Sequence, residues 1–276
     1  MSDVEAQNIA YKLMSNFFGE LDPNYDPEKD PLPQVLFRHN EISIADYLMR
    51  HREALVNDFL TGFNGLEDAI YSVGRNVIQK KDDRSPYTLN TPDADGTRFH
   101  DAVEQIVRKN IDTVHSIKNP AGWKNVELKY HDPYNNIHWD IDPVYAKAKY
   151  PTAYKLIQEF GDDCPISSYS YLAPKTSIHR HTGPENRDGE YIRIHVPLII
   201  PSGDLFFEVN GEEVKWDKVF AFDNQFAHSA HNLSDGHRLI FLIDIRRSRI
   251  GLPQGQKWNK NRQLYAMSKP FIRKGI

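Results

Sequence analysis

The sequence predicts an α+β fold in which an N-terminal helical layer packs on an antiparallel β-domain of the jelly-roll type. Three observations support this prediction. Apolar residues in the first part recur at helical spacing, the second part alternates apolar and polar residues as strands do, and turn signals separate short segments. We expect residues 1–118 to form the helical region, residues 119–250 the β-domain and residues 251–276 a basic C-terminal arm.

Three helices are predicted in the first part, over residues 9–17, 48–59 and 99–114. Ser43 precedes the second helix and stands three residues before Asp46, the spacing of a capping box. Between the helices lie two segments rich in proline and aspartate, which we expect to be loops. The apolar positions that carry the helical spacing are Ile9, Leu13, Phe17, Leu48, Leu55, Phe59, Phe99, Val103, Val107, Ile111 and Val114.

The β-domain is predicted to begin near Trp123, where Val126, Leu128 and Tyr130 alternate with polar neighbours. One more helix is expected over residues 154–160. Asn210-Gly211 predicts a tight hairpin, because both central positions of such a turn favour positive φ. Several short antiparallel strands are typical of a double-stranded β-helix, the jelly-roll barrel of cupin-like proteins. The expected strands cover residues 166–172, 191–200, 205–216, 219–223 and 238–246.

The composition is that of an ordinary globular protein, with 39% hydrophobic and 26% charged residues. The formal net charge of −4 gives no general attraction to nucleic acid or to an anionic membrane. Cys164 is the only cysteine, which excludes an intramolecular disulfide and a zinc cluster built on thiolates. The sequence shows neither a signal peptide nor a run of eighteen apolar residues. We therefore expect a cytoplasmic protein whose partner is a small molecule or a peptide; its oligomeric state is not predicted.

The chain after Asp244 carries arginine and lysine residues but no acidic residue. One interpretation is a solvated arm that packs Trp258, Tyr265 and Phe271 against the barrel. The other is a surface for an anionic substrate or partner. We favour the first interpretation.

The twelve histidines do not mark a site by themselves, because a lone histidine is more often structural than a ligand. In the strand 191–200, however, the alternation places Arg193 and His195 on one face. A half-buried guanidinium needs an anion or an acceptor, and Arg238 raises the same need at the start of an apolar strand. Two cationic positions and metal-binding imidazoles together indicate a dicarboxylate that chelates a metal at one end and is held at the other.

From about Trp123 to Arg247 the sequence resembles the aspartyl/asparaginyl β-hydroxylases and their bacterial relatives. The ordered set of motifs, with Arg238 ten residues after His228, makes chance agreement improbable. The motifs that carry the resemblance are His181-Thr182-Gly183-Pro184, Arg193-Ile194-His195, Phe222-Asp223 with His228 and Asn232, and Arg238 leading to Asp244.

The resemblance implies a dioxygenase that uses Fe(II), 2-oxoglutarate and O₂. Such an enzyme hydroxylates an unactivated C–H bond of an amino acid, an amino-acid derivative or a peptidyl residue, and releases succinate and CO₂. By the same resemblance, His181 and His228 would bind the metal, and Ser170 and Arg238 would hold the distal carboxylate of 2-oxoglutarate.

Three further site residues follow from the resemblance. Arg193 and His195 match positions that contact either the carboxylate near the iron or the substrate, and the sequence does not divide these two roles. Asp223 matches a position beside a metal-bound water. All three are candidate catalytic residues, and Arg193 and His195 are also candidate cosubstrate-binding residues.

Two positions depart from better-known patterns. Gly183 stands where many oxygenases have a carboxylate ligand; the resembled family also lacks it and completes the coordination with water. Tyr191 stands where the animal peptide hydroxylases have an arginine for an acidic substrate, so aspartyl specificity is not expected.

His138-Trp139-Asp140 and His179 are competing ligand candidates. Alternative functions are a non-catalytic cupin-like metal-binding protein, an iron halogenase and a zinc hydrolase.

Overall fold

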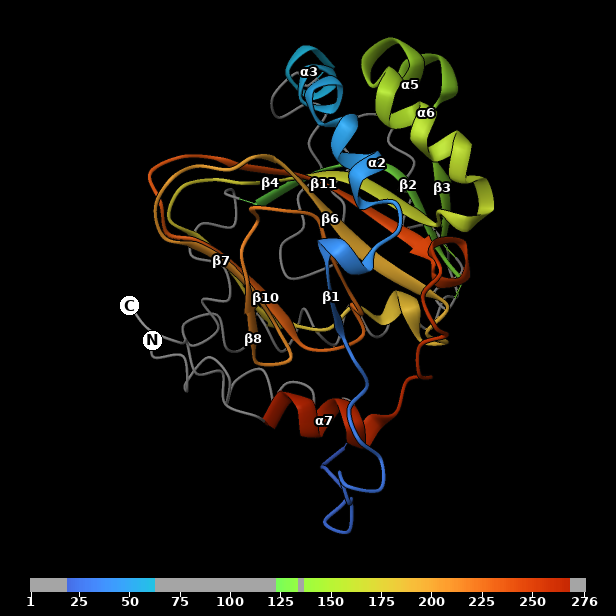
Figure 1. Ribbon diagram of the computed structural model, residues 1–276, viewed down its shortest axis with the longest axis vertical. Helices are drawn as coiled ribbons and strands as arrows, with labels where there is room; N and C mark the ends of the chain where they lie inside the picture. The colour runs from blue at the N-terminus through green and yellow to red at the C-terminus, as the bar shows by residue number, and fades with distance from the viewer. Residues whose placement is uncertain (1–18, 63–122, 134–136, 269–276) are drawn as a thin grey trace.

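Two antiparallel β-sheets face each other and form the predicted double-stranded β-helix (Figure 1). The structure is a computed structural model that describes residues 19–62, 123–133 and 137–268. The larger sheet has the strand order β1 (Leu36–Arg38), β9 (Phe220–Phe222), β6 (Tyr191–Ile199), β11 (Arg238–Arg246), β4 (Ile166–Leu172), β2 (Trp123–Asp132) and β3 (Ile137–Asp140). The smaller sheet has the order β5 (Thr176–His181), β10 (His228–Asn232), β7 (Leu205–Val209) and β8 (Glu212–Val214).

Helices cover the outer face of the larger sheet, as Figure 1 shows for α2 (Ala45–Arg50), α3 (Arg52–Gly62), α5 (Pro143–Lys149) and α6 (Pro151–Phe160). The alternation of apolar and polar residues along β6 explains why helices cover this face of the sheet. Ile192, Ile194 and Val196 are buried in the core shared with these helices. Arg193 and His195 project from the opposite face of the strand, toward the barrel interior. The predicted two-faced strand is confirmed.

Aromatic side chains contribute to the packing of the barrel interior. Phe207, Trp216 and Phe220 are each at most 2% exposed and belong to one buried cluster. The hairpin between β7 and β8 forms where Asn210-Gly211 predicted it, with φ of 49° and 85° at these two residues. The stretch 205–216, predicted as one run, is therefore two strands.

The described part of the C-terminal arm contains helix α7 (Lys260–Ser268), whose Ala266 joins the buried cluster of the barrel interior. The arm is also fastened by backbone contacts, because Trp258 N donates to the carbonyl of Arg187 at 2.7 Å. Trp258 and Tyr265 are half-buried. Phe271, the third predicted anchor, lies outside the described residues.

The region predicted to contain helices joined by loops, residues 1–118, also contains a strand at residues 36–38. These residues form β1, which extends the larger sheet by pairing with β9. A three-residue strand is too short to show a period of two, so its sequence carried no signal. The predicted helices at 9–17 and 99–114 lie outside the described residues.

The helix expected over residues 48–59 is two helices, α2 and α3, and the predicted capping box is also wrong. The N-cap residue of α2 is Ile44. The hydroxyl of Ser43 instead donates to the carbonyl of Ile250 at 2.9 Å. A tertiary contact thus replaces the local one. Helices α5 and α7 and strands β3, β5 and β10 are not among the elements that the sequence predicts.

Within the described part of the chain, every helix is too short or too polar to cross a membrane.

Candidate metal and cosubstrate site

A cavity of about 110 Å³ lies between the two sheets, and it brings together the predicted site residues with one exception, Asp223. Because side chains alternate along each strand, inward positions of several strands converge on one space. The converging residues are Ser170 from β4, His181 from β5, Arg193 and His195 from β6, His228 from β10 and Arg238 from β11.

The two predicted metal ligands are cross-strand partners. His181 on β5 pairs directly with His228 on β10, and their ring centroids are 4.2 Å apart. His228 Nδ1 lies 2.8 Å from the carbonyl oxygen of Phe226, which assigns the proton to Nδ1 and leaves the Nε2 lone pair available for a metal. Burial, together with the nearby His181 imidazole, holds the pKa of His228 well below its usual value. His228 is therefore neutral, the form that binds a metal.

Gly183 cannot be replaced by a carboxylate residue without rearrangement. A Cβ at this position would lie 2.5 Å from both Asn224 Nδ2 and Glu185 Oε2. Among the described residues, no third histidine, cysteine or carboxylate joins His181 and His228 in a cluster of ligand atoms. A metal held here would have two imidazole donors from the described residues, and its other coordination positions would be open.

Arg238 is the most unusual charge in the cavity. It is 1% exposed, and its Nε and Nη2 atoms have no hydrogen-bond partner among the described residues. Its guanidinium lies over the Trp216 ring, 4.9 Å from the centroid. Burial lowers the pKa of Arg238 to about 9, so the group is still a cation at neutral pH. A buried cation without an anion is costly, and this end of the cavity is therefore suited to a carboxylate.

His195 and Ser170 add hydrogen-bonding groups to the same cavity. Trp216 Nε1 donates to His195 Nδ1 at 3.3 Å, which places the remaining imidazole proton on Nε2. Burial and the Arg238 charge hold the pKa of His195 well below its usual value. Trp123 Nε1 donates to Ser170 Oγ at 3.2 Å, so the Ser170 hydroxyl proton is directed elsewhere. Both residues can donate to a carboxylate beside Arg238.

Arg193 already has a carboxylate partner inside the protein. Its Nε and Nη2 atoms donate to the two oxygens of Asp244 at 2.8 and 2.9 Å. The two residues are opposite each other on the paired strands β6 and β11. The anion that the sequence required for Arg193 is thus supplied, at least in part, by Asp244 rather than by a ligand.

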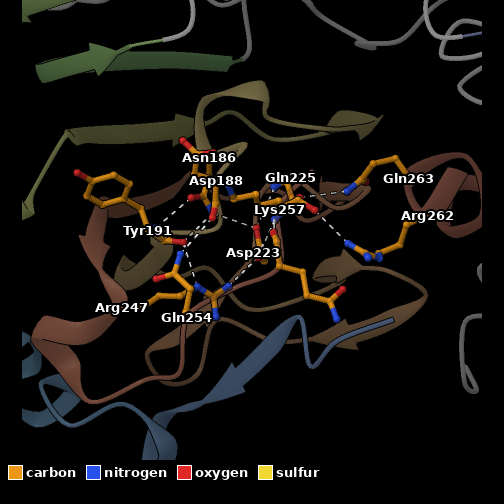
Figure 2. Close-up of polar contacts among 11 residues, drawn as sticks. Asn186, Asp188, Tyr191, Asp223, Gln225, Arg247, Gln254, Lys257, Arg262 and Gln263 are labelled. Carbon is orange, nitrogen blue, oxygen red and sulfur yellow. Dashed lines mark hydrogen bonds and ion pairs between the residues drawn. The ribbon is translucent and has the colours of Figure 1, made fainter. Parts of the chain in front are cut away.

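Asp223 lies outside the residues that line the cavity, so its predicted place beside a metal-bound water is not supported. Figure 2 shows its carboxylate among side chains that point toward it. Arg247 Nη2 and Gln225 Nε2 donate to Oδ2 at 2.6 and 3.1 Å. Asn186 Nδ2 donates to Oδ1 at 3.1 Å. These protein donors occupy both oxygens, and they fasten the loop that leads to His228.

His138 and Asp140, two of the competing ligand candidates, do not line this cavity. His138 and Asp140 lie on the exposed hairpin of β2 and β3, where Asp140 Oδ2 is 3.1 Å from His131 Nε2 and 3.5 Å from His138 Nε2. The predicted alternative, in which His138 and Asp140 share a metal with a later histidine, is therefore not formed in the described residues. The side chain of His179 is not described.

Sequence reasoning missed several residues of the cavity wall, including Glu127, Tyr130 and Glu185. Tyr130 was grouped with Val126 and Leu128. A β-bulge between Glu127 and Lys129 shifts the register, so Tyr130 turns to the cavity while Val126 and Leu128 face the helices. The polar positions along this half-buried strand were the sequence feature that could have identified the missed cavity residues.

The fold and the paired imidazoles define a double-stranded β-helix protein with a two-histidine site. The family model described as aspartyl/asparaginyl beta-hydroxylase matches residues 93–248. The chain belongs to this family, which is a family of 2-oxoglutarate- and Fe(II)-dependent hydroxylases.

Matches to individual proteins are either short or low in sequence identity. The chain is 34% identical over 79 residues to the human and the mouse aspartyl/asparaginyl beta-hydroxylases, a match that covers 28% of this chain and 10% of each relative. A solved oxidoreductase of the 2OG-Fe(II) oxygenase family from Burkholderia pseudomallei is 10% identical, with 52% of this chain and 72% of that chain covered and a TM-score of 0.32. A predicted oxalate decarboxylase from Thermotoga maritima is 18% identical, with 33% and 73% covered and a TM-score of 0.26.

We predict that Asp223 and Arg247 are energetically coupled. Replacing either one alone, as Asp223→Asn or Arg247→Met, leaves a buried partner unpaired and should lower the free energy of unfolding by about 3–5 kcal/mol. The double variant should lose less than the sum of the two single variants. Urea denaturation of all four proteins measures this coupling, and strictly additive losses would show that the ion pair does not hold this loop.

Proposed function

We propose that this protein is an Fe(II)- and 2-oxoglutarate-dependent dioxygenase that hydroxylates an amino acid, an amino-acid derivative or a peptidyl residue. The observation that carries the proposal is Arg238. A buried guanidinium, two of whose donor atoms have no partner within the described residues, lines the same cavity as the His181–His228 pair. This combination suits a ligand with a metal-chelating end and a carboxylate at the other end, and 2-oxoglutarate has both.

The chain's own groups divide the work of binding. His181 and His228 would hold the metal through neutral imidazoles, and the hydrogen bond of His228 to the Phe226 carbonyl fixes its ring. Arg238 would neutralise the distal carboxylate, and the hydroxyl of Ser170 would donate a hydrogen bond to it. His195, with its proton on Nε2, is placed to donate to a cosubstrate oxygen.

The bound metal, together with 2-oxoglutarate and O₂, supplies the oxidising chemistry that places one oxygen atom in a C–H bond of the substrate. The protein contributes orientation and the exclusion of water. Phe207 and Phe222, which are 2% and 1% exposed, line the cavity beside His228 and keep this side dry.

The proposal concerns the reaction class and not the substrates of the relatives. The chain spans about a tenth of the length of the human and mouse enzymes that it matches. The aspartyl or asparaginyl residues in their name are therefore not assigned to this chain.

The histidine pair provides the first test. We expect His181→Ala and His228→Ala each to abolish succinate formation from 2-oxoglutarate, because one imidazole cannot hold the chelated metal. Anaerobic addition of Fe(II) and 2-oxoglutarate to the unaltered protein should give a visible metal-to-ligand charge-transfer band, which both variants should lose. His39→Ala, at a histidine that lies outside this cavity and outside the group of possible metal ligands among the described residues, is the matched control. Absence of both the band and succinate in the unaltered protein would favour a metal-binding protein without turnover.

Arg238 provides the second test. Arg238→Met keeps the length and apolar stem of the side chain but removes the charge, and should weaken 2-oxoglutarate binding by about 2–5 kcal/mol. Arg249→Met removes an exposed guanidinium and serves as the control. The affinity is read from the charge-transfer band during anaerobic titration. An unchanged affinity in Arg238→Met would remove this residue from the cosubstrate site.

A further inference from the structure

Resting on the function proposed above, we infer that the substrate carries a cationic group, an ammonium or a guanidinium, and that Glu127 and Glu185 bind it. Both carboxylates line the cavity that holds His181 and His228. The inference goes against the acidic substrate that the family name suggests.

Basic and acidic residues lie at opposite ends of the cavity. Glu127 on β2 stands opposite Ser168, which in turn stands opposite Leu242, four residues along β11 from Arg238. At a rise of about 3.3 Å per residue, Glu127 lies roughly 13 Å along the sheet from the Arg238 position. The end at Arg238 would receive the cosubstrate carboxylate, and the end at Glu127 is left for the substrate.

Carboxylates outnumber cations at the substrate end. Arg193 is the guanidinium there, and its bidentate contact with Asp244 largely offsets its charge. Its Nη2 atom lies 3.9 Å from Glu185 Oε1, beyond hydrogen-bonding distance. Glu127 and Glu185 thus face the cavity without a full counter-charge among the described residues.

Glu127 is the clearest sign of a missing partner. It is 9% exposed, and its Oε2 atom has no hydrogen-bond partner within the described part of the chain. Burial raises the pKa of Glu127 to about 8, and nearby Arg193 offsets this only in part, so without a further cation beside it Glu127 is largely protonated at neutral pH. A bound cation would favour its charged form. A buried carboxylate is stable when a cation meets it, so a ligand cation would satisfy Glu127 as a carboxylate would satisfy Arg238.

Two hydrogen bonds hold the Glu185 carboxylate at a fixed position in the cavity wall. Asn224 Nδ2 donates to its Oε2 at 3.1 Å, and the Tyr130 hydroxyl donates to its Oε1 at 3.3 Å. Neither donor carries a charge, so both orient the carboxylate without neutralising it. The β-bulge after Glu127 is what brings Tyr130 to this face of β2.

A second cavity of about 390 Å³ shares Ile166 and Glu185 with the first and has further acidic residues in its wall, among them Asp132 and Asp162. The Arg246 guanidinium in this wall is paired with Asp163 and Glu190. Glu185 therefore lies in the wall that the two cavities share. Such a lining favours the entry of a cation over that of an anion.

The test measures binding to the full chain loaded anaerobically with Fe(II) and 2-oxoglutarate, followed by the charge-transfer band and by calorimetry. Nα-acetyl-L-arginine amide and Nα-acetyl-L-lysine amide carry only a side-chain cation, and Nα-acetyl-L-citrulline amide is their neutral counterpart. L-leucine and Nα-acetyl-L-leucine amide compare an α-ammonium with its blocked form. Nα-acetyl-L-aspartate amide is the acidic probe.

We expect at least one cationic probe to bind about tenfold or more tightly than its neutral counterpart. Preference for the blocked arginine or lysine probe assigns the cation to a side chain, and preference for L-leucine over its blocked form assigns it to an α-ammonium. Glu127→Gln and Glu185→Gln should each reduce this preference while leaving the charge-transfer band intact. Glu53→Gln, an exposed site on α3, is the control and should change neither quantity.

The outcomes separate this inference from the proposed function. A charge-transfer band with no preference for any cationic probe, or with tighter binding of the aspartate probe, overturns the cationic substrate and leaves the dioxygenase intact. A preference that survives both glutamate variants removes these two residues from the substrate site. Loss of the band in the unaltered protein refutes the dioxygenase itself, and the substrate inference with it.

Discussion

The buried guanidinium of Arg238 constrains the rest of the cavity. Desolvating a guanidinium is costly unless an anion or several acceptors meet it, and here the aromatic face of Trp216 is the contact that the barrel provides. Neighbouring donors, the His195 imidazole and the Ser170 hydroxyl, reinforce a demand for negative charge. The cavity is therefore suited to a ligand, because among the described residues neither Arg238 nor Glu127 has hydrogen-bond partners for all of its buried polar atoms.

Strand pairing holds the residues of the candidate site in fixed positions. The register places His181 opposite His228 and Arg193 opposite Asp244, so each functional pair is fixed by backbone hydrogen bonds rather than by flexible loops. The loop before His228 is the exception. It is held by the carboxylate of Asp223, which accepts hydrogen bonds from three residues far apart in the sequence. Asp223 thus acts at a distance from the metal position, by holding the chain that carries the ligand.

The sequence predicted correctly those structural features that rest on a repeated pattern or on residue types with one strong conformational preference. The alternation along β6 predicted both faces of that strand, and Asn210-Gly211 predicted its hairpin. It failed where tertiary contacts decide the outcome. Nothing local marks the bulge that turns Tyr130 inward, the contact that takes Ser43 away from a helix cap, or the three-residue strand β1. The partner of Arg193 was also out of reach, because Asp244 is 51 residues away and only the strand register joins them.

The most direct measurement compares two cosubstrates that differ only at the end expected to meet Arg238. 2-Oxoglutarate and 2-oxopentanoate have the same chelating end and chain length, but only 2-oxoglutarate has the distal carboxylate. Anaerobic titration of the Fe(II)-loaded protein, followed by the charge-transfer band, should show 2-oxoglutarate binding at least about thirtyfold more tightly, as expected for a buried charge pair worth about 2 kcal/mol or more. Equal affinities would contradict the account, because Arg238 would then have no carboxylate to bind.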